Sequence, residues 1–215
     1  MAVGVRPNPM LSTNTWNRVR YTVWAPVYDL VGRRFDARRR ESIRLLEPKA
    51  GERILIVGAG TGGDLPHLPP GVRVLATDLA RAMLARARER LRPDVRLAVM
   101  DGQRLAVVPG SFDGVVLHLI LAVIADPVRC LQEAAQALRP GGRLVVFDKF
   151  VRGERVPLSL RALNLLAKPL FTDVTRRFED ILERSGAPLR VEHDAPALLG
   201  GFFRHLLLGK TGGPR

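Results

Sequence analysis

Short apolar runs alternate with segments of helical spacing along the chain from residue 53 onward. Residues 53–57 (RILIV) have no polar face, which is typical of a strand that is buried on both sides. The predicted strands cover residues 53–57, 72–78, 95–100, 112–117 and 143–147, with predicted helices at 80–91 and 127–138. This repeated strand–helix order predicts an α/β fold with a parallel sheet and helices on both of its faces.

The last third of the chain has a different pattern. Helical spacing at 158–167 and 174–185 is followed by strand-like runs at 189–195 and 202–208. Only a short turn region with Pro196 and Gly200-Gly201 separates these two runs, and a parallel crossover needs a dozen residues or more. We therefore expect the two strands to pair antiparallel.

The N-terminal segment has one apolar stripe at helical spacing. Its members are Trp16, Val19, Val23, Trp24 and Val27, and Pro26 ends or kinks the predicted helix. Such a stripe favours a helical lid that lies on a membrane surface, with packing on the domain as the alternative. The expected division is therefore an arm and lid over residues 1–50, followed by one globular unit over 51–215.

The charge is strongly positive, at +13 over 215 residues, and residues 1–50 carry ten basic against four acidic side chains. This bias favours an anionic partner, either nucleic acid or the cytoplasmic face of a membrane, with an arginine-rich solvated surface as the alternative. The single cysteine, Cys130, excludes an internal disulfide and a cysteine zinc cluster. We expect no metal, a cytoplasmic location and a monomer or weak dimer, since neither a signal peptide nor an apolar run of spanning length is present.

A glycine-rich loop, residues 58–63 (GAGTGG), follows the first predicted strand, where glycines let the backbone turn tightly and approach a ligand. Asp78 ends the second predicted strand, where a carboxylate can accept both hydroxyls of a ribose. The prolines at 66, 69 and 70 leave room for about one helical turn behind the loop. We expect Asp64 to repel a phosphate there, so the loop favours a cationic, phosphate-free nucleoside such as S-adenosylmethionine over a nicotinamide dinucleotide.

Several segments together resemble the class I S-adenosylmethionine-dependent methyltransferases. The resemblance implies a Rossmann-like fold with a mostly parallel seven-stranded sheet and an antiparallel C-terminal strand, and S-adenosylhomocysteine as the product of the cofactor. The segments are Ile54–Gly62 (motif I), Asp78 (the ribose acid), Met100–Gly102 (the adenine segment), Phe112–Val116 (strand four) and Leu138–Gly142 (the turn before strand five).

Residues 21–29 (YTVWAPVYD) are similar to a motif of bacterial phosphatidylethanolamine N-methyltransferases and of ubiquinone and menaquinone C-methyltransferases. Residues 65–69 and 118–127 resemble the phospholipid enzymes more closely, whereas Phe147–Phe150 departs from their pattern. The resemblance implies N-methylation of a phospholipid head group at a membrane surface, with C- or O-methylation of a quinone or another lipophilic small molecule as the alternative. Nucleic-acid methylation is disfavoured, because residues 117–120 lack the Asn/Asp-Pro-Pro-aromatic motif. A cofactor-binding module without catalysis is a further alternative, which the intact glycine loop disfavours.

The same resemblance implies the residues of the cofactor site. We expect Asp101 to accept from the adenine amino group, although an ordinary turn at Asp101-Gly102 is the alternative. The expected cofactor-binding residues are Gly58, Ala59, Gly60, Gly62, Asp78, Leu79, Asp101, Gly102 and His118.

Three residues are candidates to assist proton removal from the acceptor: Tyr28, His118 and Tyr21. The resemblance implies that Tyr28 lies over the cofactor, with core packing beside Trp24 as the alternative. A hydrogen-bonded core residue is the alternative for His118. Asp148 and Lys149 end the fifth predicted strand, where they contact a polar head group or form a surface ion pair.

Overall fold

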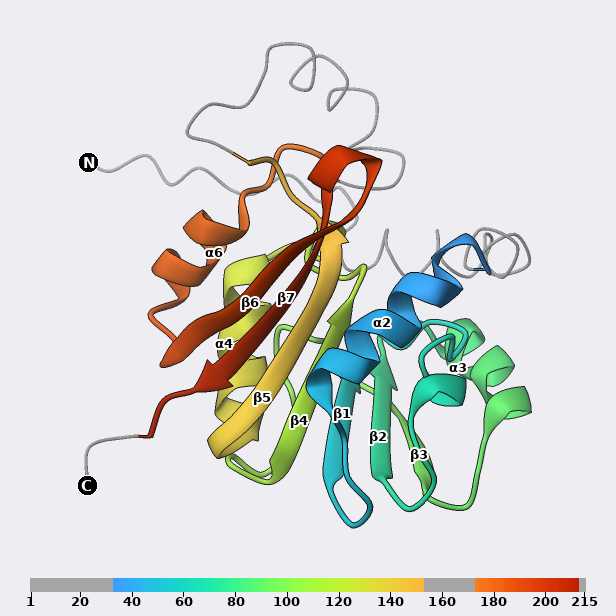
Figure 1. The fold of residues 1–215 in the computed structure, drawn as a ribbon. Helices are drawn as coiled ribbons and strands as arrows, with labels where there is room; N and C mark the ends of the chain where they lie inside the picture. Colours follow the sequence, from blue (N-terminus) through green and yellow to red (C-terminus); the bar gives the residue numbers. More distant parts are fainter. Residues whose placement is uncertain (1–32, 153–172, 213–215) are drawn as a thin grey trace, which may run out of the picture.

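Seven strands form one sheet in the order β3-β2-β1-β4-β5-β7-β6 in this computed structural model, which describes residues 33–152 and 173–212 (Figure 1). All neighbouring pairs from β3 to β5 are parallel, and β7 is antiparallel to both β5 and β6. This arrangement confirms the predicted Rossmann-like sheet with one antiparallel C-terminal strand. The strands are β1 (Arg53–Val57), β2 (Arg73–Asp78), β3 (Val95–Val99), β4 (Phe112–His118), β5 (Leu138–Lys149), β6 (Leu189–Leu198) and β7 (Phe203–Lys210).

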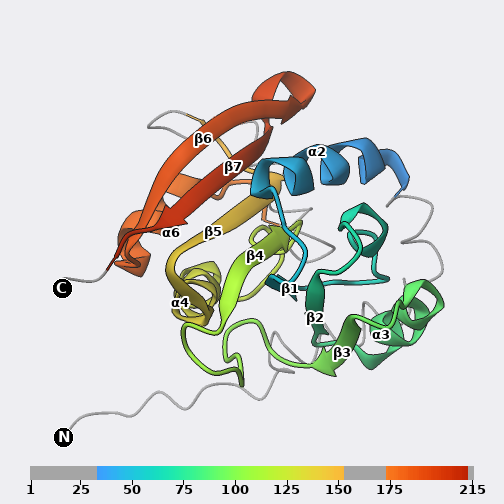
Figure 2. The ribbon, with the colours of Figure 1, turned by 60° about the horizontal axis from the view of Figure 1, so that its bottom comes forward.

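Helices cover both faces of the sheet. Helix α2 lies on one face, and α4 and α6 lie on the other, as Figures 1 and 2 show from two directions. None of the helices described is long and apolar enough to cross a membrane. The helices are α2 (Asp36–Leu46), α3 (Arg81–Ala87), α4 (Pro127–Ala137) and α6 (Phe178–Ser185), with 3-10 turns η1 (Arg33–Phe35), η2 (Leu65–His67), η3 (Arg88–Arg90) and η4 (Leu199–Gly201).

The apolar residues of β1 divide between two cores, as expected of a strand that is buried on both sides. Ile54 and Ile56 pack with Ile43 and Leu46 of α2, whereas Leu55 and Val57 belong to the core on the opposite face. Alternate residues of a strand point to opposite faces, so a run without polar positions is what a central parallel strand requires. Helix α2 therefore packs on the sheet itself, although it precedes the domain boundary expected at residue 50.

Several observed elements differ from their predicted bounds. The helix expected at 174–185 begins at Phe178, because Asp173 accepts hydrogen bonds from the Thr175 amide (3.0 Å) and hydroxyl (2.6 Å) in a turn, and the Arg176 carbonyl is used by the Val151 amide. Strand β5 begins at Leu138, which pairs with Phe112 across an irregularity. The helices predicted at 16–27 and 158–167 lie outside the described residues. The helix predicted at 80–91 divides into α3 and η3.

Candidate functional site

The predicted motifs converge on one edge of the sheet. Strands β1, β2, β4 and β5 run parallel, so their carboxyl ends lie at the same edge. The glycine loop follows β1 there, and Asp78, His118 and Lys149 are the last residues of the other three strands. In open α/β sheets this edge is where ligands bind.

The backbone of the glycine loop adopts a conformation that favours glycine at positions 58 and 60. Gly58 and Gly60 have φ values of 74° and 56°, in the left-handed region. A Cβ on Gly58 would stand 2.4 Å from Cδ1 of Ile120, whereas nothing lies within 4 Å of the corresponding position at Gly60. The amides of Gly58 and Ala59 both donate to the Thr77 carbonyl at 2.8 Å, which ties the loop to β2. Packing therefore requires glycine at 58, while at Gly60 the backbone borders open space that a ligand can enter.

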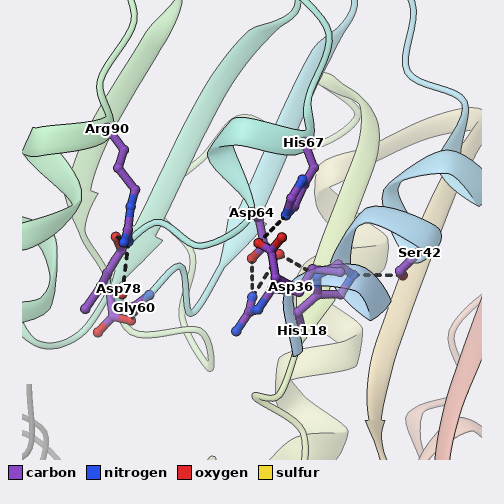
Figure 3. A network of polar contacts seen from close by, with 10 residues as sticks. Asp36, Ser42, Gly60, Asp64, His67, Asp78, Arg90 and His118 are labelled. Carbon is purple, nitrogen blue, oxygen red and sulfur yellow. Dashed lines mark hydrogen bonds and ion pairs between the residues drawn. The ribbon is translucent and has the colours of Figure 1, made fainter. Parts of the chain in front are cut away.

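Asp78 is oriented by two backbone amides at the end of β2. Its Oδ2 accepts from the amide of Gly60, which lies beside it in Figure 3, and its Oδ1 accepts from the Ala80 amide, each at 2.8 Å. Burial raises the pKa of Asp78, and these amide hydrogen bonds oppose the rise. Each carboxylate oxygen has a second lone pair with which it can accept a ribose hydroxyl. The predicted ribose acid is thus connected directly to the glycine loop.

Asp101 and Gly102 form a tight turn after β3. Asp101 Oδ1 accepts from the Gln103 amide (2.9 Å) and from its side-chain amide (3.0 Å). A Cβ on Gly102 would stand 2.9 Å from Cγ1 of Val57, so packing requires glycine there. The turn expected as the alternative is therefore present, and the adenine contact of Asp101 stays a prediction, as does the cofactor contact of the half-buried Leu79.

Asp64 lies at the centre of a buried polar network that the sequence did not predict. It is 1% exposed, and Arg39 Nη1 lies 2.8 Å from both of its carboxylate oxygens. His118 Nδ1 donates to Oδ1 at 2.7 Å. Burial alone raises the pKa of Asp64, but the charges and hydrogen bonds of Arg39 and His118 outweigh burial and hold the pKa well below its usual range. The expectation that Asp64 repels a phosphate is therefore wrong, because its charge is compensated and buried.

His118 stands between Asp64 and Ser42, with both ring nitrogens in use (Figure 3). Its Nε2 lies 2.8 Å from Ser42 Oγ, and the residue is 2% exposed. The ring also meets Phe147 edge-on, with centroids 5.9 Å apart. A catalytic base or a cofactor ligand needs a nitrogen that faces the ligand, which His118 does not offer here. The structure instead favours the alternative of a hydrogen-bonded core residue.

Helix α2 is attached to the loop region through one of its faces. Asp36 accepts from His67 Nε2 at 2.9 Å, and Arg39 and Ser42 bind Asp64 and His118. The three α2 residues are spaced at i, i+3 and i+6, so they share a helix face. This spacing was visible in the sequence, but their partners η2 and β4 are far away along the chain. A further contact that the sequence did not predict is Arg90, whose Nη1 donates to the Thr61 carbonyl.

The remaining predictions concern Asp148, the two tyrosines and metal binding. Asp148 is fully buried and accepts from the amides of Ala122 (3.0 Å) and Lys149 (2.8 Å). The ion pair expected between Asp148 and Lys149 is present, with Nζ and Oδ1 3.9 Å apart, but it is largely buried and does not lie on the surface. Burial raises the pKa of Asp148, although Lys149 is close. Tyr21 and Tyr28 lie outside the described residues. Within the described ranges, no group of three or more His, Cys, Asp and Glu side chains is placed to hold a metal ion.

The residues at this edge fit S-adenosylmethionine. The open side of Gly60 leaves room for a ligand against the loop backbone, and the carboxylate of Asp78 stands beside it, where the ribose contact stays a prediction. Only the three-residue turn η2 follows the loop, so no long helix N-terminus is available for a pyrophosphate.

Comparison with known proteins also indicates a methyltransferase. A family model described as a methyltransferase domain matches residues 55–146. A phosphatidylethanolamine N-methyltransferase from Cereibacter sphaeroides is 35% identical over 195 residues, which cover 86% of this chain and 93% of that protein. A demethylmenaquinone methyltransferase from Beutenbergia cavernae is 36% identical over 137 residues, which cover 58% of this chain and 57% of that protein.

Solved structures show the same fold at low identity. The cyclase SpnF superposes with a TM-score of 0.78 at 17% identity, covering 95% of this chain and 99% of its own. An N-methyltransferase from Haemonchus contortus was solved with phosphomonomethylethanolamine and S-adenosylhomocysteine. It superposes with a TM-score of 0.69 at 22% identity, and the match covers 89% of this chain and 48% of that one. Because one fold hosts several activities, the activity is argued from the site and from the close relatives. Identity that runs through nearly the whole of a methyltransferase, on a sheet with this loop and acid, shows that the chain belongs to the class I S-adenosylmethionine-dependent methyltransferases.

Proposed function

We propose that the enzyme methylates the amino nitrogen of a phospholipid head group, phosphatidylethanolamine, at the surface of a membrane. The observation that carries this proposal is the extent of the similarity to the Cereibacter protein, which includes 93% of that protein's length. The match therefore continues beyond the cofactor-binding core that all these methyltransferases share. A net charge of +13 supports the same substrate, because it attracts the protein to anionic lipid.

The second candidate is C- or O-methylation of a quinone or another lipophilic small molecule. It is supported by the 36% identity to the Beutenbergia demethylmenaquinone methyltransferase. That match covers 57% of the relative. It thus supports the shared cofactor domain more than the acceptor site.

The bound cofactor supplies a methyl group that its sulfonium already activates, so the protein has to position the reactants and exclude water. The loop backbone at Gly60 and the carboxylate of Asp78, which are joined by a hydrogen bond at the carboxyl edge, would hold the nucleoside there. An ethanolamine ammonium has a pKa of about 10, so it must lose a proton before its nitrogen can attack the methyl carbon. Since His118 is engaged by Asp64 and Ser42, we assign this proton transfer to Tyr28 or Tyr21.

The test supplies the purified protein with radiolabelled S-adenosylmethionine and mixed vesicles that contain phosphatidylethanolamine and demethylmenaquinone together. We expect label in monomethylated phosphatidylethanolamine and its further methylated products. The Asp78→Ala variant, purified in the same way, serves as the control at limiting cofactor, because labelling that does not fall with this change comes from a contaminating enzyme. Label in the quinone alone would refute the proposal and favour the second candidate.

A further inference from the structure

The turn between β6 and β7 lies at the same edge of the sheet as the cofactor site. Phe203, the first residue of β7, pairs with Lys149, the last residue of β5. Because β5 runs parallel to β4 and β1, the turn stands at the carboxyl edge, beside the arrowhead of β5 in Figure 1. We call residues 198–203 (LLGGFF) the β6–β7 tip.

The apex of the β6–β7 tip is an exposed leucine in a strained conformation. Leu199 is 69% exposed, and its φ of 50° lies in the left-handed region, which is unfavourable for a leucine. Glycine or asparagine makes such a turn without this cost. Leu199 is thus unfavourable on two counts, because its apolar side chain is exposed to water and its backbone is strained. A turn that only joins two strands does not require this side chain.

The base of the tip is firmly anchored. The Phe203 ring packs against Phe35 and Phe147, with centroid distances of 5.4 and 5.8 Å. The Phe202 carbonyl accepts from the Phe150 amide at 2.9 Å. Leu199 is therefore presented from a rigid support, which lowers the entropy that a docking contact has to overcome.

Cationic side chains lie at the base of the tip. The half-exposed Arg152 has its Cζ 3.8 Å from the position of a Cβ on Gly201. Arg152 pairs with Asp194 at 3.3 Å. Arg204 pairs with the same Asp194 at 2.6 Å and with Glu179 at 2.7 Å, but it is buried, so of these two guanidiniums only that of Arg152 is exposed to a ligand. An apolar apex above an exposed guanidinium suits a bilayer interface, where the apolar group enters the acyl boundary and the guanidinium meets a lipid phosphate.

We propose that the β6–β7 tip is a membrane contact, which inserts Leu199 into the interface of an anionic bilayer and turns the cofactor site toward the lipid head groups. The choice of a bilayer rests on the proposed function, since a phospholipid substrate brings a membrane to this edge. The net charge of +13 provides the long-range attraction to that surface.

A site-specific fluorophore tests the contact directly. Cys130 is the single cysteine of the sequence and is fully buried, so a Leu199→Cys variant of the full chain can be labelled at one position with an environment-sensitive dye. The matched control is Val108→Cys, which is 71% exposed in the wild type and precedes β4, at the opposite edge of the sheet. With vesicles of equal parts phosphatidylcholine and phosphatidylglycerol, we expect a blue shift at position 199 and none at 108. Equal spectra with and without vesicles at position 199 would overturn the proposal.

Affinity and activity are then measured on variants without a label. Leu199→Asn suits the left-handed backbone, and we expect it to weaken vesicle binding about tenfold, while Val108→Asn leaves binding unchanged. Methylation of phosphatidylethanolamine in detergent micelles should stay at the wild-type rate in both variants. Vesicle binding by Leu199→Asn at the wild-type affinity overturns the membrane contact. Failure of the wild type to methylate phosphatidylethanolamine in micelles refutes the proposed function instead, and the two outcomes are read from separate assays.

Discussion

Replacement of Arg39 by methionine tests whether the buried network stabilises the fold. The change removes the guanidinium that binds both oxygens of Asp64 but retains a long apolar stem. The side chains of this pair are only 11% and 2% exposed. Loss of one partner of a buried ion pair costs about 3–5 kcal/mol. Since His118 still donates to Asp64, we expect the lower end of that range.

The neighbouring Arg38→Met variant is the matched control. Arg38 pairs with Glu41 on the same helix, but these side chains are 41% and 51% exposed. An exposed pair of this kind contributes about 0–1 kcal/mol. The free energy of unfolding is measured by urea denaturation at pH 7, followed by circular dichroism. If Arg39→Met lowers the free energy of unfolding no more than Arg38→Met does, the network has no stabilising role.

The pH dependence gives a second readout of the same change. Burial raises the pKa of Asp64, but Arg39 and His118 lower it further, so the folded pKa lies below the unfolded value of about 3.9. Such a group contributes stability that is present above the unfolded pKa and is lost as pH falls through the folded pKa. Without Arg39, burial is less compensated and Asp64 takes up its proton at higher pH. The stability difference between wild type and Arg39→Met should therefore shrink as the pH falls below about 4. A difference that is constant with pH would contradict this reasoning.

The remaining predictions concern the cofactor and the reaction. Asp78→Ala should weaken S-adenosylmethionine binding by about 1–3 kcal/mol, measured by calorimetry, and unchanged affinity would remove Asp78 from the site. Gly58→Ala places a Cβ 2.4 Å from Ile120 and should lower the unfolding free energy by about 1–3 kcal/mol. Gly60→Ala meets no atom within 4 Å, so its main effect should be on cofactor affinity, and the pair is compared by denaturation and calorimetry. Either Tyr28→Phe or Tyr21→Phe should reduce kcat about 100-fold with cofactor affinity unchanged; wild-type kcat in both would exclude a tyrosine base.

The sequence predicted the elements whose pattern is local. The apolar run of β1, the glycine loop and Asp78 lie within 26 residues of one another, and each has its own backbone or chemical requirement. The antiparallel pairing of β6 and β7 followed from the short connection between them. The predictions for β1 and for the β6–β7 pairing are confirmed, because the determining interactions are close in sequence. The cofactor contacts of the glycine loop and Asp78 stay predictions.

The network around Asp64 was not predicted because its contacts are not local. Arg39 is 25 residues from Asp64, and His118 is 54 residues away. In the sequence, Asp64 follows a glycine loop and suggests an exposed charge, while Arg39 stands within a run of arginines that is typical of a solvated face. Only the packing of α2 against β4, β5 and η2 brings the charges together and removes them from water.

The position of β7 between β5 and β6 has a consequence for synthesis of the protein. Among the strands that the structure describes, β6 is hydrogen-bonded to β7 alone, although β6 leaves the ribosome first. Until residue 210 has emerged, β5 presents an open apolar edge and β6 has no strand to join. A nascent chain that pauses between these two strands already contains the whole glycine loop and its acid, yet it is exposed to edge-to-edge association. Chaperone demand should therefore be greatest while β7 has yet to emerge, when the cofactor half of the sheet has already been made.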